Sequence, residues 1–106
     1  MSPGPRLSLL GRRMPAWARL RVVAIEPGCR RTYDPAEWRG ALVVVERGEI
    51  ALECPSGARW RFEEGTVMSL ADLPICALCN ERSATVLLSA LSRADHFSAH
   101  RPSQHA

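Results

Sequence analysis

The sequence contains no lysine, so its 14 basic side chains are all arginines. These arginines are scattered along the chain, and many have an acidic residue within a few positions. A protein face that binds DNA or RNA needs a clustered basic stripe with aromatic or groove-reading elements. Although the net charge is +3, this distribution predicts no nucleic acid partner.

Long apolar runs are also missing. No stretch approaches the ~20 apolar residues that a helix needs to cross a bilayer, so we expect no membrane partner. Near the N-terminus, Arg6, Arg12 and Arg13 surround an apolar patch shorter than the ~7–15 residues of a secretory signal. These features predict a cytoplasmic protein whose four cysteines are reduced thiols.

Histidine is absent from the central part of the chain, and His96, His100 and His105 all lie near the C-terminus. No Ser-His-Asp or Cys-His constellation and no phosphate-binding loop is visible. His96 and His100 would share a helix face and could bind zinc or nickel adventitiously, but a solvated tail is the favoured interpretation. The sequence therefore leaves open whether the protein is an enzyme.

The remainder of the chain shows the pattern of short strands and turns. Its 106 residues suffice for one domain. We predict a flexible leader over 1–15, a domain over 16–92 and a flexible polar tail over 93–106. A loop is expected at 34–37. Strands separated by turn signals every 8–12 residues predict an all-β sandwich or barrel, with strands at 18–26, 29–33, 41–46, 49–54, 58–63, 66–71, 75–80 and 84–91.

Two of these strands have informative patterns. The continuous apolar run ALVVVE (41–46) indicates a strand buried on both faces. In EIALEC (49–54), Ile50, Leu52 and Cys54 alternate with residues of the opposite face. We expect the glutamates Glu46, Glu49 and Glu53 around this hairpin to be solvated.

Two segments, VVVERGEIAL (43–52) and EEGTVMSLADLPICALCN (63–80), resemble the two sequence motifs of the cupin superfamily. In the second segment, Gly65 stands at the motif's glycine turn and Asn80 at its asparagine. With flanking strands, the resemblance covers about residues 18–92. It implies a small cupin-like barrel (a double-stranded β-helix, or jelly roll) of about seven or eight strands. Because cupin-like barrels commonly pair through edge strands, it also implies a homodimer.

The metal ligands of the cupin family are missing from this chain. Aligning the motifs places the first motif's two histidines near Asp34 and Ala36, its glutamate at Ala41, and the second motif's histidine at Cys76. Ala36 and Ala41 carry no donor atom. The remaining carboxylate of Asp34 and thiol of Cys76 are fewer than the three or four protein ligands that such metals usually need. The resemblance therefore implies a barrel with no metal site and no cofactor, and fold alone does not transfer an activity.

Cys76 and Cys79 have the C-x-x-C spacing of redox and zinc sites. In a strand, residues three apart point to opposite faces, so the two thiols would not meet at one ion or form one disulfide. Free thiols in or near the core are the favoured interpretation. The residual alternative is an inward-pointing, reactive Cys76.

Three functions remain open. The first is a small-ligand-binding or regulatory module, with an interior pocket lined by Trp38, Val43, Val45, Leu52, Met68, Cys76 and Leu78. The second is a cupin enzyme of isomerase or dioxygenase type that uses an atypical metal set of Asp34, Glu37 and Cys76. The third is an interaction scaffold whose interior is filled by side chains. Tyr33, Trp38 and Trp60 could line the barrel mouth or cover its sides, and Arg39, Arg59 and Arg61 are candidates for gripping an anionic ligand.

Overall fold

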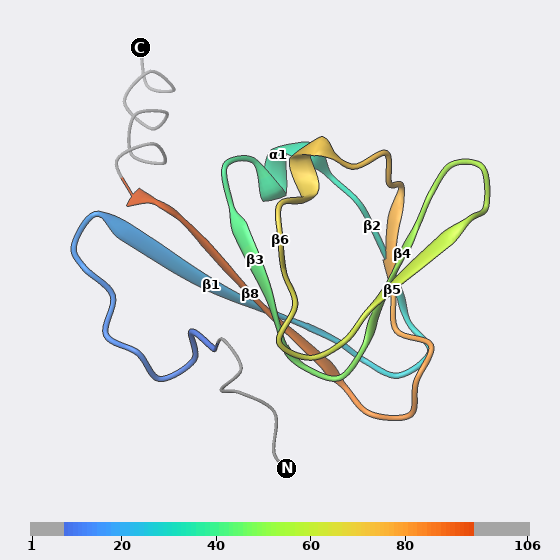
Figure 1. Ribbon diagram of the computed structural model, residues 1–106, viewed down its shortest axis with the longest axis horizontal. Coiled ribbons are helices and arrows are strands. Elements are labelled where there is room, and N and C mark those ends of the chain that lie inside the picture. The colour runs from blue at the N-terminus through green and yellow to red at the C-terminus, as the bar shows by residue number, and fades with distance from the viewer. Residues whose placement is uncertain (1–7, 95–106) are drawn as a thin grey trace.

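The structure is a computed structural model that describes residues 8–94. Its chain forms, in order, β1 (Ala18–Ile25), β2 (Arg30–Thr32), α1 (Pro35–Trp38), β3 (Leu42–Arg47), β4 (Ile50–Glu53), β5 (Arg59–Phe62), β6 (Val67–Met68), the 3-10 turn η1 (Leu70–Asp72), β7 (Ala77–Cys79) and β8 (Val86–Arg93) (Figure 1). Within these residues, no helix combines the length and the apolar character needed to cross a membrane.

The strands form two antiparallel four-stranded sheets. The first sheet has the order β1-β8-β3-β6, and the second sheet has the order β2-β7-β4-β5. The chain passes repeatedly from one sheet to the other, and the first and last strands pair over the full length of β1, from Ala18↔Arg93 to Ile25↔Val86. The prediction of an all-β fold is confirmed.

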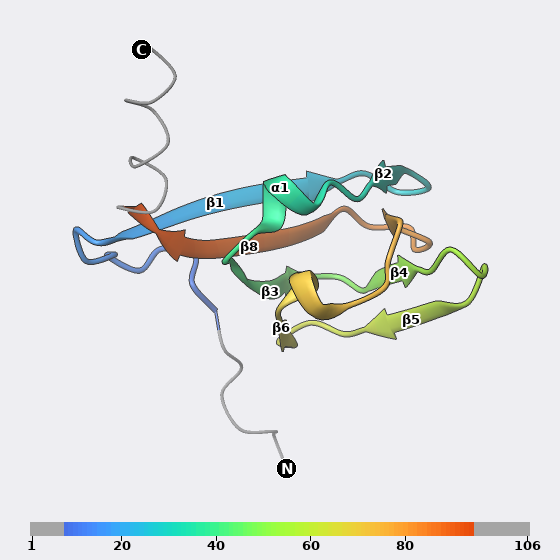
Figure 2. The same cartoon turned by 90° about the horizontal axis from the view of Figure 1, so that it is seen from above.

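The two sheets enclose one hydrophobic core between them. Alternate residues of β1, β3, β4, β7 and β8 point into it, and α1 and η1 lie near each other over one end (Figures 1 and 2). The run Val43, Val44 and Val45 is at most 1% exposed, which confirms its predicted burial on both faces. Ile50, Leu52 and Cys54 are also buried, as their alternation predicts.

Glycine is required where β3 turns into β4. Gly48 has φ +83°, a conformation that side chains with a Cβ rarely adopt, and a Cβ there would stand 3.1 Å from Cγ2 of Val86. This turn lets β3 and β4 follow each other closely although they belong to different sheets.

Several element boundaries differ from the predicted ones. Residues 35–38 form α1 in place of a loop, because Asp34 caps the helix and Pro35 occupies its first turn. The strand expected over 66–71 ends at Met68 and is followed by η1. The last strand runs to Arg93, two residues further than expected. Most of the predicted tail, with His96, His100 and His105, lies outside the described residues.

Part of the predicted leader packs against the first sheet. Leu9 and Leu10 are half-buried, and Ser8 and Leu9 both hydrogen-bond the Glu46 carboxylate on β3. Glu46 is itself only 8% exposed, so the prediction that it is solvated is wrong.

Candidate functional site

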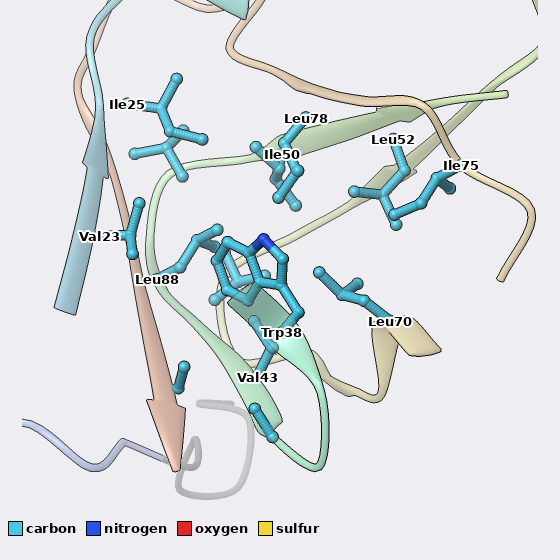
Figure 3. Close-up of a cluster of buried hydrophobic side chains, with 14 residues drawn as sticks. Val23, Ile25, Trp38, Val43, Ile50, Leu52, Leu70, Ile75, Leu78 and Leu88 are labelled. Atoms are coloured by element: carbon cyan, nitrogen blue, oxygen red, sulfur yellow. The ribbon is translucent and has the colours of Figure 1, made fainter. Parts of the chain in front are cut away.

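The predicted pocket residues other than Cys76 lie in or against the core and fill it. Trp38 reaches the centre of the core from α1, where its indole is surrounded by side chains from both sheets (Figure 3). Its Nε1 makes no hydrogen bond with any described residue, so packing accounts for its position. Of the predicted residues, Met68 is partly buried against the core, and the fully buried ones are Trp38, Val43, Val45, Leu52 and Leu78.

Cys76 does not line the interior, so this part of the predicted pocket is wrong. β7 begins only at Ala77, and Cys76 precedes it. Its side chain packs with Ala51, Ala77 and Cys79 on the outer face of the second sheet. Ile75 occupies the core instead. The alternation argument that separated Cys76 from Cys79 fails because it assumed that the strand began at residue 75.

The atypical metal set is not brought together. The Asp34 carboxylate accepts a hydrogen bond from the backbone of Ala36 at the start of α1. Glu37 binds two arginines, while Cys76 lies on the outer face of the second sheet. Among the described residues, no group of three or more His, Cys, Asp and Glu side chains could hold a metal ion.

A polar cluster that the sequence did not predict lies where β1, β2 and α1 meet. Arg21 donates from Nη1 to Glu37 Oε2 at 3.0 Å and from Nη2 to the Glu37 carbonyl at 2.9 Å, and Arg31 also donates to that carboxylate. The Arg21 guanidinium lies 4.9 Å from the centroid of the Trp38 ring, within cation–π range.

The charge on Glu37 is stabilised by these arginines. Burial opposes the charged form of its carboxyl, but the hydrogen bonds and charges of Arg31 and Arg21 outweigh burial and hold its pKa below the usual range. The cluster orients α1 and thereby places Trp38. The pattern of single strands does not predict this cluster, because its members belong to three different elements and meet only in the folded chain.

The outer face of the second sheet carries a network of ion pairs. Arg59 and Arg61, predicted as anion-binding residues, pair with Glu81, and Arg30 donates to Glu53 at 3.2 Å. The Arg30 bond and charge lower the pKa of Glu53. Here the arginines are matched by carboxylates of the chain itself, so the network accounts for their presence without an external anion.

The outer face of the first sheet is apolar. Its side chains form cross-strand rows, because directly paired residues point to the same side. One row is Leu20, Leu91 and Leu42, and the next is Val22, Ser89, Val44 and Val67. The four most exposed large apolar residues on or beside this face are Trp17 (57%), Val22 (49%), Leu42 (47%) and Val67 (41%).

An open hollow lies at the edge of this face. It has a volume of about 390 Å³ and is lined by Trp17, Gly40, Ala41, Leu42, Ser69, Leu91, Ser92 and Arg93. This volume lies within the range of small-molecule sites. Its lining is mainly apolar, with two serines and one arginine as the polar side chains.

Comparisons with models of protein families and with curated proteins found no match for this chain.

Proposed function

We propose that this chain is a cupin-like jelly-roll barrel that binds no metal and acts as a regulatory or interaction module, not as an enzyme. The observation that carries the proposal is the filled interior. Trp38, Leu52 and Leu78 are completely buried at positions that would line an interior pocket. Cupin-type chemistry needs space and ligands inside the barrel, and these side chains take up that space.

The topology supports the jelly-roll part of the proposal. A jelly roll has eight strands arranged in two sheets. Here the orders β1-β8-β3-β6 and β2-β7-β4-β5 place the first strand beside the last, and every pair of consecutive strands except β4 and β5 is divided between the sheets. The two segments that resemble cupin motifs contribute β3, β4, β6 and β7.

The positions aligned with the family's metal ligands support the absence of a metal. Ala36 and Ala41 offer no donor atom. Asp34 is engaged as a helix cap, and Cys76 lies outside the barrel. A module whose interior is closed would act through its surface, and the first sheet offers an apolar one.

Metal analysis of purified, untagged full-length protein tests the proposal. We expect a variant with His96, His100 and His105 replaced by alanine to contain near-zero metal by elemental mass spectrometry. The unmodified chain serves as the control for metal held by the tail histidines. One equivalent of iron, zinc or manganese that survives chelation in the variant would contradict the proposal and favour the alternative of an enzyme with an atypical metal site.

Binding of a small apolar ligand is a second candidate, favoured by the hollow beside Trp17 and Leu42. Anilinonaphthalene sulfonate is a suitable probe because its aromatic ring system matches the apolar lining of the hollow. Saturable probe fluorescence that Leu42→Ser abolishes and Trp60→Ser preserves would support this candidate. Equal probe binding by both variants would contradict it.

A further inference from the structure

The first sheet is apolar on both of its faces. Its inner face belongs to the core, through residues such as Val23, Val43 and Leu88. Its outer face consists of the rows through Leu42 and Val22 described above. Ser89, the polar residue of these rows, donates to the buried Glu46 carboxylate on β3 at 2.5 Å. An antiparallel sheet with one face in water normally places polar residues on that face.

The second sheet provides an internal comparison. Its outer face carries charged pairs such as Arg30–Glu53 and Arg59–Glu81, as a water-exposed sheet should. The two sheets have the same number of strands and belong to one chain. The apolar outer face of the first sheet is therefore a local property and does not follow from a generally apolar composition.

The chain covers only part of this face with its own residues. Ser8, Leu9 and Leu10 lie against Glu46, and Val44 and Ser89 nearby are fully buried. Val22, Leu42 and Val67 remain about half exposed, with Trp17 at the rim. Contiguous exposed apolar surface of this kind marks an interaction site.

We propose that the outer face of the first sheet binds the same face of a second copy of this chain, giving a two-fold symmetric dimer with the sheets stacked face to face. This inference rests on the proposed function as an interaction module. It differs from pairing through edge strands, because side chains, not backbone groups, form the contact. Stacked sheets lie about 10 Å apart, and a twisted apolar sheet is complementary to its own copy.

The size of the face is compatible with a weak dimer. Eight residues of β1 span about 26 Å, and strands lie about 4.8 Å apart, so the four strands present a projected area of about 400 Å². Protruding side chains and Trp17 add accessible area, while Ser8 and Leu9 of the same chain already cover part of the face. Interfaces that bury less than ~1,200 Å² in total are typical of weak and transient complexes.

Light scattering coupled to size-exclusion chromatography over about 1–200 μM tests the proposal with the full chain. We expect the unmodified protein to reach a dimer mass within this range. Val22→Glu should remain monomeric, because it places a carboxylate within the apolar contact. Trp60→Glu is the matched control: Trp60 is similarly exposed (40%) but belongs to β5 of the second sheet, so this variant should still dimerise.

Circular dichroism of both variants separates loss of dimerisation from loss of folding, and the milder Val22→Thr should weaken the dimer if Val22→Glu fails to fold. An unmodified protein that is monomeric at 200 μM would overturn the proposal, as would a dimer that tolerates Val22→Glu. A monomer that instead sediments with phosphatidylglycerol vesicles, and loses this property in Val22→Glu, would overturn it in favour of a lipid surface. None of these outcomes depends on metal content, so this inference and the proposed function can fail separately.

Discussion

The carboxylate of Glu46 joins three segments that are far apart in the sequence. It accepts hydrogen bonds from the Ser8 hydroxyl (2.5 Å), the Leu9 amide (2.8 Å) and the Ser89 hydroxyl (2.5 Å). Burial opposes its charge, but these bonds, with one from the Leu10 amide, outweigh burial and hold the pKa of Glu46 below the usual range. One residue thus attaches the segment before β1 to the first sheet.

Glu46→Gln should therefore release residues 8–10 from the sheet. The Leu9 and Leu10 amides now donate to the carboxylate oxygens of Glu46. In the variant, the NH2 group of the glutamine side chain is also a donor, so it cannot accept these bonds. We expect a loss of roughly 1–3 kcal/mol in the free energy of unfolding and faster tryptic cleavage after Arg12 and Arg13. Glu49→Gln is the control, since Glu49 pairs with Arg82 at the surface and such pairs contribute at most about 1 kcal/mol. Equal cleavage rates in the two variants would contradict this role for Glu46.

The same residue predicts how stability depends on pH. The pKa of Glu46 is lower in the folded state than the usual glutamate value of about 4.3. Its stabilisation is therefore complete above that value and is lost as the pH falls through the folded-state pKa. In urea unfolding between pH 7 and pH 3, the stability difference between the unmodified protein and Glu46→Gln should shrink at the acidic end.

At the scale of elements, α1 is short but determines what occupies the interior. Its four residues carry both Glu37, which binds Arg21 and Arg31, and Trp38, which fills the core. The helix is too short to be stable by itself. Its position depends on the Asp34 cap and on the contacts of these two side chains.

Asp34→Ala should accordingly destabilise the protein by about 1 kcal/mol, because the Ala36 amide loses the side-chain acceptor that caps α1. Asp34→Asn keeps a capping oxygen and should cost clearly less. Chemical denaturation of the two variants measures the difference. If asparagine costs as much as alanine, the contribution of Asp34 comes from its charge and not from the cap.

Most strands could be predicted from the sequence because burial leaves a recognisable apolar pattern on them. The alternating positions Ile50 and Leu52 indicated β4, and the continuous apolar run indicated that β3 is buried on both faces. Short elements were the difficulty. The Asp34-Pro35 signal of α1 was present but was interpreted as a loop, and β7 is only three residues long, so a two-residue error at its start placed Cys76 on the wrong face.

The candidate sites were harder to predict because they depend on contacts between distant segments. The sequence identified Val43 and Val45 correctly as buried from their continuous apolar run, and Leu52 from alternation. However, nothing in the local pattern of ALVVVE distinguishes a glutamate in solvent from one held by Ser8, Leu9 and Ser89. The same applies to the Arg21–Glu37–Arg31 cluster, whose members come from β1, α1 and β2.

At the scale of the whole molecule, the proposed dimer predicts that stability depends on concentration. If the apolar face is buried only in a dimer, association stabilises the folded state by mass action, by about 1.4 kcal/mol of dimer for each tenfold rise in concentration. For a domain of this size, that corresponds to a rise of a few degrees in Tm. We expect the Tm of the unmodified protein to rise between 5 and about 500 μM, and that of Val22→Glu to stay constant. Calorimetry at the two concentrations measures this, and a constant Tm in the unmodified protein would mean that the outer face of the first sheet does not bind a second copy over this range.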